Sequence, residues 1–327
     1  MAKILRKGYT TGVHTSFAFI FALQSFMATK TLSKAFTHKM DNDDLDVTKG
    51  CEIVVTISDK KKDLKLNKIA HKPYIIGSLE LYAGIGVGVV SKEGLKPPKG
   101  YPAINPTPLQ SIANIYSDLY KEEKTPLYCS VSVTDGEELA KQTANAKVGV
   151  LGGISILGTT GFVKPVSADA YLDSIRTELG VAKANGYNQA ILTLGNSSFT
   201  YAKEHYDEMQ IVEIGNFVYD ALEIVDNIGI EKAIFICGIG KASKVMQGCK
   251  NTHNRFGSID FVDLQEQIFN ELEIWVDIEI TKTVKGISLQ LKELNLLDEF
   301  YAMIKQKTEE KMTAWFENLN IEVKVLK

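Results

Sequence analysis

No part of the 327-residue chain reaches the roughly 18 uninterrupted apolar residues that a membrane span requires. An excess of positive charge is also missing, because 37 lysines and arginines stand against 40 aspartates and glutamates and the formal net charge is −3. The chain therefore has no global basic field that would draw it onto nucleic acid or an anionic membrane. An anionic ligand would need a local group of cations or exposed backbone amides.

Cysteine is scarce as well. The four cysteines lie far apart and show no C-x-x-C spacing, which argues against a zinc knuckle, an iron–sulfur motif or a disulfide framework. We therefore expect no metal site built by the protein, and a reducing cytoplasm as its location. The cysteines are Cys51, Cys129, Cys237 and Cys249.

The N-terminal segment MAKILRKGYTTGVHTSFAFIFALQSF combines a basic start with an apolar stretch, which is the outline of a signal peptide. Polar residues such as His14 and Gln24 interrupt the apolar stretch, and no clean cleavage site follows it. The segment therefore predicts a buried helix that is capped by Thr10 or Thr11.

The strand and helix patterns change along the chain. In the first half, β-branched strand patterns cluster in runs, which predicts an α+β domain. After about residue 165 strands alternate with helices, which predicts βαβ units and a parallel sheet. We expect an α+β N-terminal domain (1–165) followed by a smaller α/β domain (166–327) with a short parallel sheet. The expected strands are 51–58, 74–82, 87–92, 127–133, 189–196, 209–216, 232–241 and 321–327. In the second half, helices are expected at 168–184 and through 217–228, after the strands 189–196 and 232–241, and near 261–273 and 297–317.

Residues 148–171, VGVLGGISILGTTGFVKPVSADAY, contain five glycines at the expected domain junction. A simple connection needs one or two, whereas glycine inside a strand pattern marks a turn or a close approach to the backbone. Clefts between domains favour small-molecule sites, so a ligand or a second chain segment is expected to approach these glycines. The alternative is a structural crossing between domains.

Three of the expected parallel strands end in glycine, in LTLGN, VEIGN and ICGIGK. Ligands of open α/β sheets gather at the carboxyl ends of strands, so three such ends in succession favour a crevice. Lys241 could supply a cation for a carboxylate there, although a solvated lysine is an equal alternative. The glycines of AGIGVGVV (83–90) precede a strand pattern and not a helix, so a nucleotide loop is not expected there.

Two polar motifs have simple structural interpretations. The aspartates of the loop at 38–50 resemble half of a calcium loop, but its glycine and glutamate are missing, so an EF-hand is rejected in favour of an acidic turn. In NTHN (251–254), a lone histidine flanked by amides is more often a structural residue than a catalytic one.

The order of these motifs resembles one family. GYTTG, a DD-x-DVT loop, GVGVVSKEGL, PAINPTP, GGISILGTTGFVKP, a G-x-GK strand end and NTH together resemble the cobalt-precorrin-5B C1-methyltransferases (CbiD) of anaerobic cobalamin biosynthesis. The resemblance extends from residue 6 to about residue 260, and GGISILGTTG and PAINP are its most specific blocks. It implies methyl transfer from S-adenosylmethionine to ring carbon C1 of a corrinoid substrate, whose cobalt arrives as part of the substrate.

The chain departs from the family pattern at several points. Val13 and His14 stand where the family continues with Thr-Cys, Gly238 stands where it has a histidine, and the acidic loop lacks its glycine and proline. These departures leave a catalytically altered corrinoid-binding protein as the alternative to the enzyme. An unrelated dinucleotide-binding oxidoreductase is the third hypothesis.

The resemblance, together with the residue chemistry, sets the expected site. Methyl transfer from a sulfonium is an in-line displacement, so it needs positioning and not a covalent nucleophile. Expected partners are a small corrinoid, with no nucleic acid and no membrane, and the apolar helices leave room for a homodimer. The expected catalytic residues are Asp43, Asp44, Asp46 and His253. The expected cofactor-binding residues are Gly152, Gly153, Ser155, Gly158, Thr159, Thr160, Gly195, Asn196, Gly215 and Asn216. The expected substrate-binding residues are Thr10, Thr11, Asn105, Lys241, Asn251 and Thr252.

Overall fold

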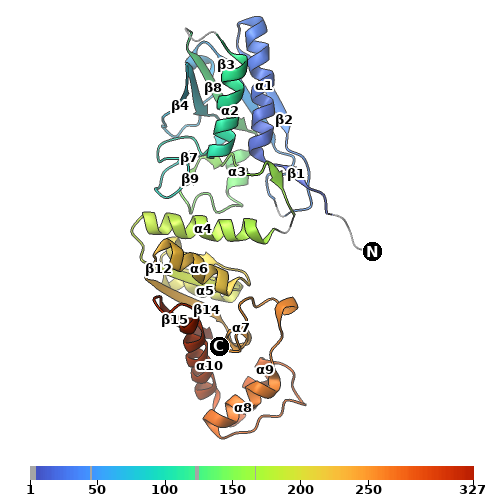
Figure 1. Cartoon of the computed structure of the whole chain (residues 1–327), viewed down its shortest axis with the longest axis vertical. Coiled ribbons are helices and arrows are strands. Elements are labelled where there is room, and N and C mark those ends of the chain that lie inside the picture. Colours follow the sequence, from blue (N-terminus) through green and yellow to red (C-terminus); the bar gives the residue numbers. More distant parts are fainter. Residues whose placement is uncertain (1–4, 45, 122–124, 166) are drawn as a thin grey trace. The chain divides into compact units, whose positions relative to one another are not determined.

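The computed structural model describes residues 5–44, 46–121, 125–165 and 167–327. The chain forms two compact units, Met1–Ala168 and Asp169–Lys327 (Figure 1). Both contain helices and sheets, so the mixed α/β class expected from the sequence is present. The expected domain boundary involves residue 166, which lies outside the described residues. Within the described ranges, no helix is both long and apolar enough to cross a membrane.

A five-stranded sheet forms the centre of the first unit. Its strands, in spatial order, are β2 (Ser33–His38), β3 (Glu52–Ser58), β8 (Leu127–Val133), β5 (Leu79–Ala83) and β4 (Tyr74–Ile76). Neighbouring strands are antiparallel except β5 and β8, which run parallel. Helices α1 (Thr11–Thr29) and α2 (Pro106–Leu119) contact each other and pack on the sheet (Figure 1).

The core of the first unit explains these elements. Every second residue of β3 is fully buried at Ile53, Val55 and Ile57, as the period of a strand requires. These side chains share one apolar cluster with Phe19 of α1 and Ile112 of α2. One face of the sheet and the two helices therefore enclose a single core.

The helix predicted at the N-terminus is confirmed, and its cap is Thr10. The Thr10 side chain accepts a hydrogen bond from the Val13 amide at 3.4 Å, which serves one of the unpaired donors of the first turn. The buried residues of α1 include His14, whereas Phe17 and Phe21 on another face are exposed. The polar interruptions seen in the sequence thus lie partly inside the fold.

The single strand predicted over 74–82 is wrong. Gly77 and Ser78 form a turn, so β4 and β5 make an antiparallel hairpin. Gly77 has φ +60°, a conformation that glycine adopts without a steric penalty. Strand β2 is not predicted from the sequence. It lies at the edge of the sheet and leaves Lys34, Phe36 and His38 exposed, so its apolar pattern is weak.

Three short pairings bind the glycine-rich stretch into the first unit. The pairs are β9 (Val150–Leu151) with β7 (Val89–Val90), β10 (Gly153–Ile154) with β6 (Gly86–Val87), and β11 (Phe162–Val163) with β1 (Gly8–Tyr9). Helix α3 (Gly136–Ala140) contacts β6 and β10. The stretch is therefore part of the sheet structure of this unit.

The second unit contains a four-stranded sheet. Its strands, in spatial order, are β13 (Ile211–Glu213), β12 (Gln189–Leu194), β14 (Lys232–Gly238) and β15 (Asn320–Leu326). All neighbours are parallel, which confirms the parallel pairing predicted for the first three strands. The chain passes from β12 to β13 on one side and returns to β14 on the other, so the switch point lies between β12 and β14.

Helices cover both faces of this sheet. Helix α5 (Asn196–His205) packs on one face with Ile191, Ile234 and Ile236. The opposite face carries the larger core, which contains Leu192 and Phe235. Around that core lie α4 (Ala168–Ala184), α6 (Val218–Ile228), α7 (Ile239–Met246), α8 (Phe261–Leu272), α9 (Val284–Glu293) and α10 (Leu297–Trp315). Helix α9 is not among the elements that the sequence predicts.

Candidate functional site

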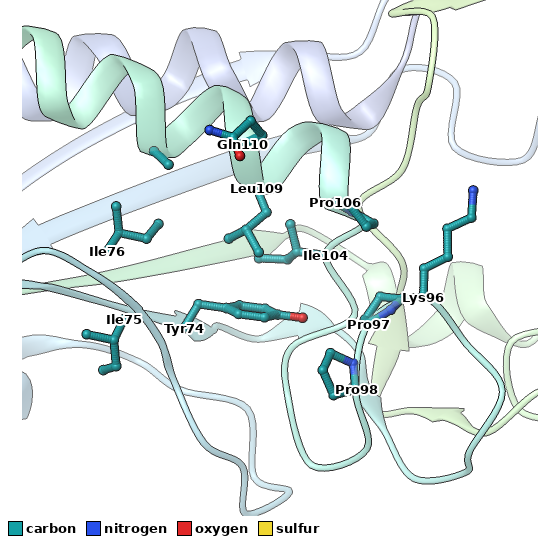
Figure 2. A pocket seen from close by; sticks show the side chains of 11 residues that line it. Tyr74, Ile75, Ile76, Lys96, Pro97, Pro98, Ile104, Pro106, Leu109 and Gln110 are labelled. Carbon is teal, nitrogen blue, oxygen red and sulfur yellow. The ribbon is translucent and has the colours of Figure 1, made fainter.

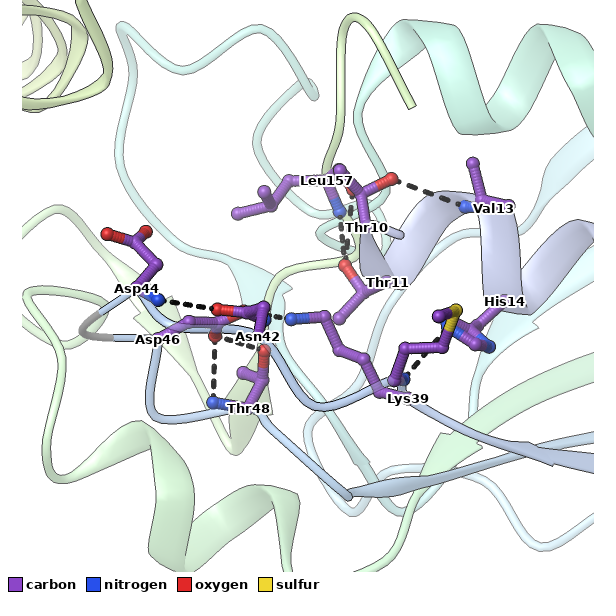
Figure 3. Close-up of polar contacts among 11 residues, drawn as sticks. Thr10, Thr11, Val13, His14, Lys39, Asn42, Asp44, Asp46, Thr48 and Leu157 are labelled. Atoms are coloured by element: carbon purple, nitrogen blue, oxygen red, sulfur yellow. Dashed lines mark hydrogen bonds and ion pairs between the residues drawn. The ribbon is translucent and has the colours of Figure 1, made fainter. Parts of the chain in front are cut away.

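The acidic loop of the first unit is organised around Asp46 (Figure 3). Asp46 Oδ1 accepts hydrogen bonds from the Thr48 amide at 2.9 Å and the Thr48 hydroxyl at 2.5 Å. Asp46 Oδ2 forms an ion pair with Lys39 and accepts from Asn42 Nδ2 at 3.5 Å. The Lys39 side chain is only 2% exposed, so this carboxylate neutralises a buried cation.

The surroundings of Asp46 fix its charge. Burial alone would raise the pKa of Asp46, but the hydrogen bonds from Lys39 and Thr48 outweigh it and lower the pKa. Both carboxylate oxygens are already used inside the chain. Asp46 therefore holds the loop together, and its expected catalytic role stays a prediction.

Asp43 is held by Arg6. The Arg6 amide donates to Asp43 Oδ2 at 2.9 Å, and the guanidinium donates to Oδ1 through Nε at 3.2 Å and through a terminal nitrogen at 2.9 Å. The same guanidinium reaches Asp41 at 2.8 Å. For Asp44, the backbone amide donates to Asn42 Oδ1 at 3.0 Å, and Figure 3 shows its side chain directed away from the Asp46–Lys39 pair.

His14 is a residue of this region that is not among the site residues expected from the sequence. Its Nε2 accepts a hydrogen bond from the Met40 amide at 3.2 Å, so α1 is joined to the start of the acidic loop (Figure 3). Burial lowers the pKa of His14, and the nearby Lys39 charge lowers it further. The signals in the sequence are a histidine inside a largely apolar helix and its departure from the family pattern.

The GYTTG turn contacts the glycine-rich stretch directly. Thr11 Oγ1 accepts from the Leu157 amide at 2.9 Å and donates to the Leu157 carbonyl at 3.2 Å, and the Gly12 amide donates to the same carbonyl at 3.0 Å. Gly158 has φ +140°, and a Cβ there would overlap the Thr10 hydroxyl. A second chain segment, one of the two expected possibilities, therefore approaches Gly158.

Other glycines of this stretch also meet the chain. A Cβ on Gly152 would lie 2.8 Å from Asn67 Nδ2, and a Cβ on Gly153 would overlap the backbone of Gly86. Thr159 and Thr160, in contrast, are exposed. The glycines permit close packing within the unit, whereas the two threonines face solvent.

Ile104 and Pro106, the two neighbours of Asn105 in the chain, line an apolar cavity of about 480 Å³ (Figure 2). The Asn105 amide donates to the Ile156 carbonyl at 2.9 Å, and the Asn105 carbonyl accepts from the Leu109 amide at 3.1 Å in the first turn of α2. Tyr74 donates its hydroxyl proton to the Pro102 carbonyl at 3.2 Å, and burial raises the pKa of Tyr74 to about 12. The cavity is lined by Tyr74, Ile75, Ile76, Lys96, Pro97, Pro98, Ile104, Pro106, Leu109, Gln110 and Ala113.

The second unit presents open glycines at the switch point of its sheet. Gly195 and Gly238 precede α5 and α7, and no side chain caps either helix. A Cβ added to Gly195, Gly238 or Gly240 would meet no atom within 4 Å. Backbone amides of two helix N-termini therefore border open space between adjacent strands, an arrangement that suits an anionic or polar ligand.

Asn216 connects the next strand end to Lys241 and Thr252. Lys241 Nζ donates to Asn216 Oδ1 at 2.9 Å and to the Thr252 carbonyl at 3.1 Å, and the Thr252 hydroxyl donates to Asn216 Oδ1 at 2.9 Å. Burial lowers the pKa of Lys241, and the charge of Lys244 lowers it further. Three of the predicted residues are thus brought together, although they are separated by up to 36 positions.

The remaining predicted residues of this unit have local roles. His253 Nδ1 accepts from the Arg255 amide at 3.2 Å, and its ring is exposed. Asn251 Oδ1 accepts from the His253 amide at 3.0 Å. Gly215 has Tyr171 Oη 3.1 Å from the place of a Cβ. Among the described residues, no group of three or more histidines, cysteines or acids could hold a metal ion.

These features define a two-unit protein. Its first unit carries the acidic loop, and its second carries the open glycine edge, which consists of Gly195, Gly238 and Gly240. The family model CbiD matches residues 17–165. A cobalt-precorrin-5B C(1)-methyltransferase of Methanococcus aeolicus is 34% identical over 286 residues, which cover 86% of this chain and 73% of that protein. The chain therefore belongs to the CbiD family, which confirms the resemblance seen in the sequence.

Other similar proteins carry the same name. The cobalt-precorrin-5B C(1)-methyltransferase of Methanocaldococcus jannaschii is 32% identical over 286 residues, covering 86% of this chain and 75% of that protein. That of Thermus thermophilus is 38% identical over 221 residues, covering 67% and 55%. A crystal structure of a cobalamin biosynthesis protein (cbiD) from Archaeoglobus fulgidus is 25% identical, with a TM-score of 0.36, covering 74% of this chain and 79% of that one.

Proposed function

We propose that this protein transfers a methyl group from S-adenosylmethionine to C1 of cobalt-precorrin-5B, giving cobalt-precorrin-6A, in anaerobic cobalamin biosynthesis. The observation that carries the proposal is the 286-residue match to a relative of that name. Neither unit is long enough to contain a match of that length, so both units share the family relationship. The cobalt is part of the substrate.

The glycine edge of the second unit suits the methyl donor. When bound, S-adenosylmethionine supplies a methyl group on a sulfonium. Open space at Gly195 and Gly238 leaves room for a ligand, and the amides of α5 and α7 suit its carboxylate. Asn196 follows β12 and Asn216 follows β13, and both add polar side chains at these strand ends.

The 152–160 loop contributes to cofactor binding through its exposed residues in this proposal. Thr159 and Thr160 are exposed and can contact a ligand directly. Gly152, Gly153 and Gly158 act indirectly, since they let Asn67, Gly86 and Thr10 pack against the loop and so fix its backbone. Ser155 is partly exposed between these two groups.

The acidic loop would act mainly by orienting groups. Asp43 and Asp46 are positioning residues in this proposal, because Arg6, Lys39 and Thr48 already occupy their oxygens. We assign contact with ligand or proton handling to Asp44, whose side chain points away from the Asp46–Lys39 pair (Figure 3). This division fits a reaction that needs alignment of donor and acceptor more than a covalent nucleophile.

Apolar groups and polar or charged groups would both hold the substrate. In the first unit the apolar cavity beside Asn105 suits the apolar part of a macrocycle, and Lys96 at its wall suits a carboxylate (Figure 2). Thr10 and Thr11 shape the region through their bonds to α1 and Leu157. In the second unit Lys241, Asn251 and Thr252 supply cation and hydrogen bonds, and His253 caps the turn that follows.

A label-transfer experiment tests the enzyme against its alternative. The purified protein is incubated anaerobically with cobalt-precorrin-5B and methyl-labelled S-adenosylmethionine, and the corrinoid is analysed by mass spectrometry. We expect label in the corrinoid, and we expect Asp44→Asn to lower the rate at least about tenfold while the melting temperature is retained. Corrinoid binding without label transfer would instead support the catalytically altered binding protein.

Two further proposals concern assembly and location. We propose a homodimer, supported by Phe17 and Phe21, which lie one turn apart on α1 and are 47% and 57% exposed. Light scattering of the wild type and of Phe21→Lys measures the oligomeric state, and a monomeric wild type would contradict the proposal. We also propose action in the cytoplasm, as expected from the sparse cysteines.

A further inference from the structure

A stretch of the second unit carries only positive charge. Residues 232–259 contain five lysines and arginines and no aspartate or glutamate, although the whole chain has a formal net charge of −3. Lys232 pairs with Glu322 at 2.7 Å. Within the part of the chain that the structure describes, the other four cations form no ion pair: Lys241, Lys244, Lys250 and Arg255.

Two of these cations are held at one carbonyl group. The Thr252 carbonyl accepts from Lys241 Nζ at 3.1 Å and from Lys244 Nζ at 3.2 Å. The Lys244 residue is 7% exposed, and its other partners are Asn254 Oδ1 at 2.8 Å and the Gly257 carbonyl at 3.0 Å. All of these acceptors are neutral, so two neighbouring ammonium groups lack a counter-charge.

The other two cations belong to the segment that follows α7, and each lies against an aromatic ring. Lys250 Nζ is 3.7 Å from the centre of the Tyr219 ring, and the Arg255 guanidinium is 4.5 Å from that of Phe256. Aromatic faces attract cations but do not neutralise them. The segment is joined to the strand-end glycines because the Thr252 amide donates to the Asn216 carbonyl at 3.0 Å.

We infer that Lys241, Lys244, Lys250 and Arg255 form a site for a ligand with several carboxylates, and that Lys244 positions Lys241 and Thr252 within it. This inference rests on the proposed function and deepens it, since the acetate and propionate groups of the corrinoid substrate supply such carboxylates. A single carboxylate, such as that of S-adenosylmethionine, would leave most of the four charges unpaired. The third proton of Lys241 has only a weak partner, the Thr252 hydroxyl at 3.4 Å, and can turn to a carboxylate.

Calorimetric binding of matched probes tests the site. The probes are cobyrinic acid, a corrinoid with seven carboxylates, cobinamide, whose side chains end in amides, and S-adenosylmethionine. We expect Lys244→Met and Lys250→Met each to weaken cobyrinic acid binding at least about tenfold and to reduce its salt dependence. Binding of cobinamide and S-adenosylmethionine should stay unchanged. Lys203→Met, which removes an exposed lysine at the far end of α5, is the matched control.

Cobyrinic acid affinities of Lys244→Met and Lys250→Met equal to that of Lys203→Met would overturn the inference. Because Lys250 is exposed, Lys250→Met keeps the test valid if Lys244→Met does not fold. Equal losses for S-adenosylmethionine would assign the cations to the methyl donor and also overturn it. If label transfer fails but the lysine variants lose cobyrinic acid binding, the proposed function fails and the polycarboxylate site stands.

The pH dependence separates positioning from a merely structural role. The charged or titratable groups that act on Lys241 are Lys244 and Cys237, while its hydrogen-bond partners Asn216 and Thr252 are neutral. Removing the Lys244 charge should raise the pKa of Lys241, so cobyrinic acid binding in Lys244→Met should persist to higher pH than in the wild type. Lys244→Arg should restore the wild-type profile, and identical profiles for all three proteins would contradict the positioning role.

Discussion

Asp46 and Lys39 show how a single buried charge shapes the acidic loop. The lysine side chain is almost fully buried, and the carboxylate, together with Thr48, gives the loop its conformation. A buried pair of this kind adds little net stability over an apolar pair, but loss of one partner leaves an uncompensated charge. Substitution of Asp46 should therefore act mainly by lowering the stability of the folded protein.

We expect Asp46→Asn to lower the free energy of unfolding by about 3 kcal/mol at neutral pH, because Lys39 loses its counter-charge. Urea denaturation monitored by circular dichroism measures the loss. The double variant Lys39→Met/Asp46→Asn removes both charges and should recover most of it. If the single and double variants are equally unstable, the ion pair is not the cause.

The ion pair of Asp46 and Lys39 should also make the stability of the protein depend on pH. The pKa of Asp46 is lowered on folding from its usual value of 3.8, so the ionised form contributes stability above about pH 4. That contribution should be lost as the pH falls through the lower pKa of the folded state. Unfolding free energies of the wild type and Asp46→Asn should therefore converge below pH 4. A difference that stays constant from pH 7 to pH 3 would contradict this assignment.

Gly158 allows a second test at the level of one residue. Its φ of +140° and the overlap of a Cβ with Thr10 predict that Gly158→Ala loses about 2 to 4 kcal/mol of stability. Gly50→Ala is the matched control, because Gly50 has φ +69° but nothing within 4 Å of its Cβ position. Thermal melts compare the two. Similar losses would mean that backbone strain alone, and not contact with Thr10, fixes Gly158.

At the scale of elements, the sequence predicts strands well where their side chains are buried. β8 was expected at the residues where it lies, and the parallel pairing of β12, β13 and β14 follows from strand–helix alternation. β2 and the 74–82 hairpin are harder to predict, because an edge strand and a two-residue turn leave weak apolar patterns. Helix identity is local, whereas pairing partners depend on the whole unit.

Residues of the candidate site were also predictable where their signal is local and not where it depends on distant parts of the chain. Asn216, Lys241 and Thr252 could be predicted as candidates because each follows a strand or belongs to a recognisable motif. Arg6 and Lys39 could not, since their roles depend on the chain returning from the N-terminus to the acidic loop. His14 becomes significant only when β2 places Met40 beside α1.

We expect a substitution at the open glycine edge to leave the protein folded but to weaken its binding of the methyl donor. Gly238 has an ordinary φ of −79° and nothing within 4 Å of its Cβ position, so Gly238→Val should fold with a small loss of stability. The added side chain should fill the crevice and weaken S-adenosylmethionine binding about tenfold or more. Gly180→Ala in α4 is the control, because it also enters open space but lies away from the strand ends. Unchanged calorimetric affinity in a folded Gly238→Val protein would remove this edge from the donor site.

At the scale of the whole molecule, each unit has its own apolar core. The core of the first contains Phe19 and Ile53, and that of the second contains Phe235 and Phe300. Family membership could be predicted because its motifs occur in order through both units, which no single motif could establish. The roles proposed for each unit could not be predicted from the sequence, because they depend on which side chains each core leaves exposed.

Separate cores predict that the second unit folds alone. Residues 169–327 contain a complete parallel sheet with apolar residues on both faces and helices over each. A domain of this size buries about two thirds of the surface of its unfolded chain, which is enough for a stable core. We expect the fragment 169–327 to unfold in one cooperative thermal transition and to show a native-like circular dichroism spectrum. A fragment that melts without cooperativity, while the full chain melts sharply, would mean that the second unit needs the first in order to fold.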